Sequence, residues 1–209
     1  MADLAAISEN VQKGQAKRVE QLVQQALDEG FDVAEVLENG LIAGMAVIGE
    51  KFKKNEVYVP EVLIAARAMK AGMKILEPEL ASAGVKPYGI AAIGTVKGDL
   101  HDIGKNLVSM MLQGAGFKVM DLGIDQTPAS FIKAAKEGAQ VLCLSALLTT
   151  TMPQMAEVVK ARNEAGLKVP ILIGGAPVTQ SYCDEIKADG YAPDAASAVD
   201  VAKKLIGKA

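Results

Sequence analysis

The chain has 209 residues, a formal net charge of −3 at pH 7, 4% aromatic residues and no tryptophan. It therefore offers neither a basic field for phosphate backbones nor an aromatic stacking surface, and nucleic acid is not expected as a partner. The length allows one large domain or two small ones, and half of the residues are hydrophobic, which suffices for a packed core.

Residues 1–20 lack the basic start and apolar run of a secretory signal. The sequence contains no unbroken apolar segment long enough to span a bilayer, so no membrane partner is expected. The two cysteines, Cys143 and Cys183, are too few for a disulfide framework. With a single histidine they cannot form an ordinary zinc site either. We therefore expect a cytoplasmic protein with reduced thiols.

Residues 1–84 show helical periodicity throughout, because apolar residues recur three and four positions apart. A polar turn over residues 49–63 interrupts the pattern. Short connections favour a small antiparallel four-helix bundle. The helices are expected around residues 3–13, 16–30, 32–52 and 61–80.

Residues 82–89, SAGVKPYG, break this pattern with glycine and proline and indicate a linker. After them, strand-like apolar runs alternate with helical segments, which is typical of a parallel sheet with helices on both faces. We predict an all-α four-helix cap over residues 1–86 and an α/β Rossmann-like (flavodoxin-like) domain over residues 87–209. The strands of its five-stranded parallel sheet are expected at residues 88–95, 117–123, 140–147, 169–175 and 190–193.

In open sheets of this kind ligands bind beyond the carboxyl ends of the strands. The turns at that edge are GTVKGDLHD, LGIDQTP, SALLTTTM and GGAPV. Within GDLHDIGKN, residues 98–106, lies the only histidine, His101, with Asp99 close by. The glycines match neither the dinucleotide-binding nor the P-loop pattern.

A neutral imidazole can bind a metal through one ring nitrogen while the other donates to a carboxylate such as Asp99. One histidine cannot hold a bare ion, so the other ligands would have to come from a macrocycle. A solvated histidine on a surface loop explains His101 equally well.

The two later turns offer weaker signals. Ser145, Thr149 and Thr151 bring hydroxyls to the sheet edge, although such residues also commonly cap helices. Gly174 and Gly175 would allow a ligand to approach the backbone, although a tight strand-to-helix turn also favours glycine.

In the helical half, Phe52, Tyr58 and Val59 could form an apolar lid over a flat ligand or simply pack within their own turn. Glu38 lies among apolar neighbours on the preceding helix, where a solvated helix face is its simplest explanation.

Taken together, GDLHDIGKN, SALLTTT and IGGAPV at their downstream spacings resemble the cobalamin-binding module of B12-dependent methionine synthase. The chain is most similar to the stand-alone corrinoid proteins of anaerobic methyltransferase systems. The resemblance covers nearly the whole chain, because the helical half is similar to that family's cap. It implies cobalamin or a related corrinoid as the cofactor, with methylcobalamin as the charged state.

The resemblance also implies roles for individual residues. His101 would be the lower axial ligand to cobalt, Asp99 would hydrogen-bond its distal nitrogen, and Thr151, a serine in methionine synthase, would extend this relay. Phe52 and Val59 would cover the methyl-bearing face. At the position of Val59, methionine synthase has a leucine. The residues implied to bind the cofactor are Glu38, Phe52, Val59, Gly98, Asp99, Leu100, His101, Asp102, Ile103, Gly104, Ser145, Leu147, Thr149, Gly174, Gly175 and Ala195.

The implied function is a methyl carrier that is not catalytic alone. A substrate-specific methyltransferase of the O-demethylase, methylamine, methanol or betaine type would load it. A second methyltransferase would pass the methyl group to tetrahydrofolate or coenzyme M, and a reductive activase would restore oxidised cobalt. The alternatives are a B12-binding sensor or regulator with the same cap and sheet, and a flavodoxin-like domain without cofactor, which would stay colourless with added cobalamin.

Overall fold

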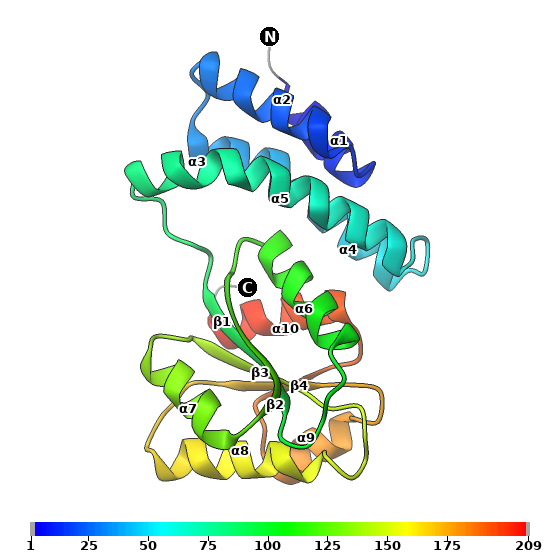
Figure 1. Cartoon of the computed structure of the whole chain (residues 1–209), viewed down its shortest axis with the longest axis vertical. Coiled ribbons are helices and arrows are strands. Elements are labelled where there is room, and N and C mark those ends of the chain that lie inside the picture. Colours follow the sequence, from blue (N-terminus) through cyan, green and yellow to red (C-terminus); the bar gives the residue numbers. More distant parts are fainter. Residues whose placement is uncertain (1–2, 208–209) are drawn as a thin grey trace. The chain divides into compact units, whose positions relative to one another are not determined.

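The computed structural model describes residues 3–207. The chain divides into two compact units (Figure 1). One contains the residues up to Tyr88 together with Gly114–Gly116, and the other contains Gly89–Gln113 and the residues from Phe117 on. In residues 3–207 there is no helix that is long and apolar enough to cross a membrane.

The first unit is built of helices. Helix α1 packs against α4 and η1, and α2 packs against α5. The apolar residues at helical spacing face inward as expected, and Val11, Leu41 and Leu76 have no exposed surface. The elements are α1 (Leu4–Gln12), α2 (Ala16–Asp28), α3 (Val33–Glu35), η1 (Val36–Ile42), α4 (Ala43–Lys53) and α5 (Val59–Ser82).

Residues 32–52 do not form the single regular helix expected from their periodicity, because the wider π-helical turns of η1 separate α3 from α4. Glu38 lies in η1 and is exposed. The neighbouring Gly40 packs tightly, since a Cβ there would lie 3.1 Å from the Ile7 side chain. The polar turn is also shorter than expected, because Phe52 still belongs to α4 and Val59 already begins α5.

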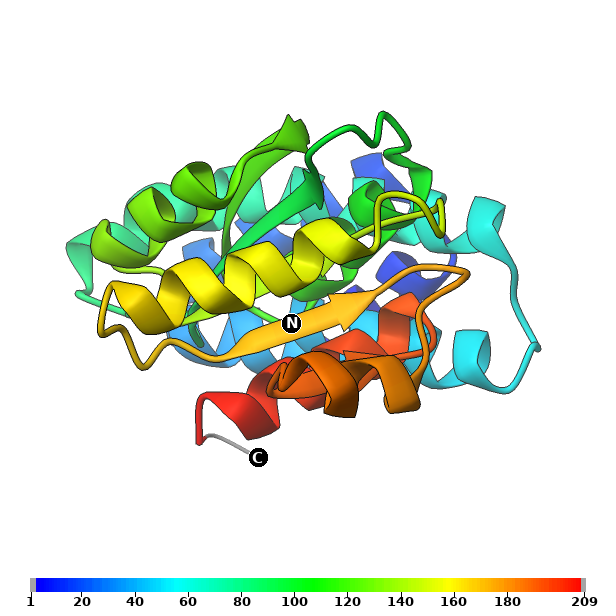
Figure 2. The ribbon, with the colours of Figure 1, turned by 90° about the horizontal axis from the view of Figure 1, so that it is seen from below.

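The second unit alternates strands and helices. Within residues 3–207, its five strands are parallel and lie in the order β2-β1-β3-β4-β5. Helices α6 and α10 cover one face of this sheet (Figure 1), and α7, α8 and α9 cover the other, with α8 and α9 facing the viewer in Figure 2. The predicted fold class is thus confirmed. The elements are β1 (Ile90–Val96), α6 (Ile103–Gly114), β2 (Lys118–Gln126), α7 (Pro128–Lys136), β3 (Val141–Ser145), α8 (Pro153–Glu164), β4 (Ile171–Gly174), α9 (Gln180–Ile186), β5 (Gly190–Ala192) and α10 (Ala195–Leu205).

The strand order creates a topological switch point between β1 and β3. From β1 the chain passes through α6 to β2 on one side, and it returns through α7 to β3 on the other side of β1. Connections that leave neighbouring strands for opposite faces open a crevice at the carboxyl ends of the strands. Thr95 of β1 stands opposite Ser145 of β3 at this end. The loops that follow these two strands therefore meet at the crevice.

An ion pair between a buried lysine and an exposed aspartate joins α6 to β2. The Lys105 ammonium lies 2.6 Å from both carboxylate oxygens of Asp121. The Lys105 side chain is 3% exposed and that of Asp121 is 45% exposed. Asp121 also accepts a hydrogen bond of 2.9 Å from the Gly123 N–H. Because a buried ammonium needs a charged partner, this pair fixes the first turn of α6 on the strand beside it.

Asp121→Asn is expected to lower the free energy of unfolding by about 1–3 kcal/mol, because it removes the charge opposite a buried ammonium. The matched control is Glu137→Gln in the exposed Lys133–Glu137 pair, whose charged atoms lie 3.8 Å apart. That control should cost less than about 0.5 kcal/mol. Chemical denaturation followed by circular dichroism measures both. Equal losses would contradict a specific role for the Lys105–Asp121 pair.

Candidate functional site

The turn between β1 and α6 is held in shape by its backbone conformation and by hydrogen bonds. Gly98 has a φ of 81°, a left-handed conformation that glycine adopts without strain. The Thr95 hydroxyl donates a hydrogen bond of 2.8 Å to the His101 carbonyl. The Asp102 carbonyl accepts the Asn106 N–H at 2.8 Å, so Asp102 stands at the start of α6.

Asp99 is the centre of the site and has no exposed surface. Its Oδ1 lies 2.8 Å from His101 Nδ1 and also accepts the His101 backbone N–H at 3.1 Å. Its Oδ2 accepts the Thr151 hydroxyl at 2.7 Å and the Leu147 N–H at 2.8 Å. One oxygen is thus bound by the loop after β1 and the other by the loop after β3.

This environment determines the charge of Asp99. Burial would raise the pKa of its carboxyl, but hydrogen bonds from the Thr151 hydroxyl, the Leu147 N–H and His101 outweigh burial and hold the pKa well below its usual range. An ionised carboxylate can only accept hydrogen bonds, so Nδ1 of His101 must carry the hydrogen that lies between them. In the neutral ring the Nε2 lone pair is then available to a metal.

Large apolar side chains are exposed around this histidine, whose own side chain is 50% exposed. Leu100 and Ile103, in the same loop and the first turn of α6, are 67% and 78% exposed. Leu147 after β3 and Ile124 in β2 are 43% and 39% exposed. Because β1, β2 and β3 are neighbours in the sheet, these side chains share one edge. The edge is suited to a ligand with a broad apolar face.

The protein's own backbone requires a glycine at position 175, directly after β4. Gly175 has a φ of 135°, and a Cβ there would lie 1.9 Å from the Ala146 carbonyl oxygen. Gly174 is the last residue of β4, and Ser145, half-buried, is the last residue of β3. Thr149 is exposed in the loop after β3. Glycine at position 175 therefore permits close approach of two backbones.

The residues of this unit fit a corrinoid. The donor set is one imidazole with a carboxylate on its distal nitrogen, flanked by apolar side chains. Beside it, Gly104 is exposed, and a Cβ there would meet nothing within 4 Å. The open space suits a bulky group next to the histidine loop. Ala195, by contrast, is buried in the first turn of α10. Glu38, Phe52 and Val59 belong to the helical unit, and their contact with a cofactor stays a prediction.

Two residues of this edge were missed by sequence reasoning. Leu148 N–H donates to Asp99 Oδ2 at 3.3 Å. Asp125, in the turn LGIDQTP, accepts the Gly98 N–H at 2.7 Å and donates its own N–H to the Asp99 carbonyl at 3.1 Å. The position of that turn at the carboxyl end of a strand was the only signal available.

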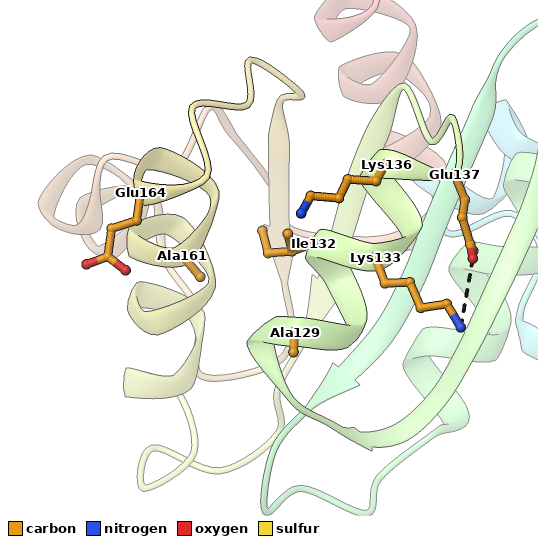
Figure 3. Close-up of a pocket in the computed structure, with 7 residues that line it drawn as sticks. All are labelled: Ala129, Ile132, Lys133, Lys136, Glu137, Ala161 and Glu164. Carbon is orange, nitrogen blue, oxygen red and sulfur yellow. Dashed lines mark ion pairs between the residues drawn. The ribbon is translucent and has the colours of Figure 1, made fainter.

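A separate groove lies between α7 and α8 (Figure 3). It contains none of the predicted site residues, and Lys133 and Glu137 face each other across an ion pair at its margin. The groove is lined by Ala129, Ile132, Lys133, Lys136, Glu137, Ala161 and Glu164.

Within residues 3–207, no three or more histidine, cysteine or acidic side chains are arranged to hold a metal ion.

The fold and site define a doubly wound α/β protein with a candidate binding edge, centred on one histidine, at the switch point of its sheet. Residues 89–200 match a family described as B12 binding domain, and residues 4–77 match a second family of the same description. The chain therefore belongs to the B12-binding corrinoid proteins, and its cofactor is cobalamin or a related corrinoid, as predicted.

Its relatives include a corrinoid protein of Desulfitobacterium hafniense (strain Y51), 41% identical over 214 residues, with 100% of this chain and 99% of that protein covered. Dimethylamine corrinoid protein 2 of Methanosarcina mazei is 47% identical over 180 residues, or 84% of either chain. A chain in the crystal structure of the methanol:cobalamin methyltransferase complex from Methanosarcina barkeri superposes with a TM-score of 0.87 at 30% identity. That match covers 97% of this chain and 79% of the other.

Thr151→Val keeps the shape of the side chain but removes a donor to the buried Asp99 carboxylate. At neutral pH it should lower the free energy of unfolding by about 1–3 kcal/mol, whereas Thr151→Ser, the matched control, should cost less because it keeps the hydroxyl.

The loss should depend on pH. Because the pKa of Asp99 is depressed in the folded protein, its stabilising contribution is fully present above the unfolded carboxyl pKa, about 3.9, and is lost as pH falls through the lower folded value. The difference between the two variants should therefore shrink below about pH 4. If the difference persists undiminished in acid, the loss of stability comes from packing and not from the hydrogen bond to the carboxylate.

Proposed function

We propose that the protein is a corrinoid methyl carrier, the shuttle component of a multi-component methyltransferase system. The observation that carries this proposal is the buried, ionised Asp99 bound to Nδ1 of a half-exposed His101 at the switch point of the sheet. Relatives named as dimethylamine and trimethylamine corrinoid proteins support it. So does the similarity to a chain of a methanol:cobalamin methyltransferase complex.

His101 would bind cobalt through Nε2 as the lower axial ligand, displacing the cofactor's own base. The bound corrinoid supplies a cobalt centre that can take up and release a methyl group. Asp99 orients the imidazole and raises its basicity by accepting the Nδ1 hydrogen. Since hydrogen bonds favour the ionised form of Asp99, the hydrogen between them stays on the imidazole at neutral pH.

Thr151 acts through Asp99. Its hydroxyl lies 2.7 Å from Asp99 Oδ2 and 2.9 Å from the Leu148 carbonyl oxygen. The hydroxyl, together with the backbone donors of the same loop, would keep the carboxylate in place whether or not the cofactor carries a methyl group. Gly104 would leave room for the displaced base and its nucleotide tail beside α6.

The carrier would work with a substrate-specific methyltransferase, for which we propose the methylamine or O-demethylase class. A second methyltransferase would transfer the methyl group to tetrahydrofolate or coenzyme M, and a reductive activase would restore oxidised cobalt. The direct test supplies the reconstituted, reduced protein with candidate partner enzymes and methyl donors in turn and follows its absorption spectrum. A protein that takes up corrinoid but is methylated with none of these partners would contradict a carrier role.

His101→Gly should retain some cobalamin, because the apolar edge and the tail region remain, but its absorption spectrum should change with the loss of the axial nitrogen. Added imidazole should shift the spectrum back toward that of the unaltered protein by filling the vacated position. Glu164→Gln, an exposed change in α8, is the control and should leave the spectrum unchanged. An unchanged spectrum in His101→Gly would refute the axial role.

A further inference from the structure

Asp125 contacts the histidine loop from a neighbouring strand. It lies near the end of β2, and its Oδ1 accepts the Gly98 N–H at 2.7 Å. Its own N–H donates to the Asp99 carbonyl at 3.1 Å. The two hydrogen bonds hold the backbone at the two ends of the Gly98–Asp99 segment. Asp99 carries the carboxylate that contacts His101.

The backbone around Asp125 is shaped for this contact. Its φ is 53°, a left-handed conformation that aspartate tolerates better than most residues. The register between β1 and β2 shifts between Ile93 and Gly94 and again between Gly94 and Val96. Irregularities of this kind redirect side chains and occur often beside active sites. Here they accompany the end of β2, where both hydrogen-bonding groups of Asp125 meet the loop after β1.

We propose that Asp125 is a positioning residue for the axial histidine, an inference that rests on the proposed function of His101. The loop after β3 binds the side chain of Asp99, and Asp125 binds the backbone on either side of it. Both attachments are needed to fix where the carboxylate stands. Because Asp99 orients the imidazole, Asp125 sets the position of Nε2 relative to the sheet edge.

Because Asp125 is exposed, its role in positioning His101 can be distinguished from a general contribution to the free energy of unfolding. The residue is exposed, and the loss of one hydrogen bond is small compared with the free energy of unfolding of a whole domain. Losing its side chain should therefore leave the fold intact while loosening the loop. A merely structural role would not affect the coordination of cobalt by His101.

The test compares Asp125→Gly with Asp125→Asn. Glycine accepts the left-handed backbone but has no side-chain acceptor, whereas asparagine keeps both the oxygen and the tolerance of that conformation. In the cofactor-free protein, amide hydrogen exchange at Gly98 should be faster in Asp125→Gly and unchanged in Asp125→Asn. Circular dichroism should show the same fold for both.

In protein labelled with nitrogen-15 histidine, loaded with cobalamin and reduced to cobalt(II), a doublet splitting in the electron paramagnetic resonance spectrum reports histidine coordination, because the cofactor's own base gives a triplet. The equilibrium should move about tenfold away from coordination in Asp125→Gly, the factor expected from one lost hydrogen bond, and stay within about twofold in Asp125→Asn.

Two results would overturn the positioning role. One is unchanged coordination in Asp125→Gly despite faster exchange at Gly98. The other is an equal loss in both variants, which would assign the effect to charge. Wild-type protein without the nitrogen-15 doublet would instead contradict the proposed function of His101, so the two failures are distinguishable.

Discussion

The site depends on a buried carboxylate, that of Asp99, both of whose oxygens accept hydrogen bonds. A charge without solvent is costly unless hydrogen bonds satisfy it, and Asp99 receives them from His101 on one side and from Leu147 and Thr151 on the other. These partners come from the loops after β1 and β3, which only the strand order of the sheet brings together. The topology therefore places the negative charge of Asp99 beside the single histidine. The carboxylate orients the imidazole and keeps the hydrogen on Nδ1, which leaves the lone pair of Nε2 available.

Most of the fold could be predicted from the sequence, because its periodicity changes from helical to alternating near residue 88. Each predicted strand lies close to an observed one. The exception in length is β2, which continues past the expected end at residue 123 to Gln126. That extension depends on pairing with β1 across a shifted register, which no local pattern records. The π-helical turns around Glu38 escaped prediction for a similar reason, since their apolar spacing is nearly that of an α-helix.

The site was less accessible to sequence reasoning. The residues alone suggested that His101 pairs with Asp99 but explained His101 equally well as a solvated surface residue. The resemblance to corrinoid proteins favoured the pairing, which the structure places at 2.8 Å. Gly175 was interpreted as room for a ligand or a tight turn. The structure shows a turn there, in which the Val178 N–H donates to the Gly175 carbonyl at 2.9 Å, and also a close approach to the Ala146 carbonyl oxygen. Asp125 could not be predicted, because its contact with Gly98 joins residues 27 positions apart.

The most direct test of the central claim is electron paramagnetic resonance of the cobalt(II) form reconstituted with unlabelled cobalamin in protein labelled with nitrogen-15 histidine. The chain contains one histidine, so a signal from labelled imidazole can come only from His101. Coordination by its ring nitrogen predicts that the triplet splitting from ordinary nitrogen becomes a doublet. A triplet that survives labelling would show that the cofactor's own base remains on cobalt, and the account of this site would then be wrong.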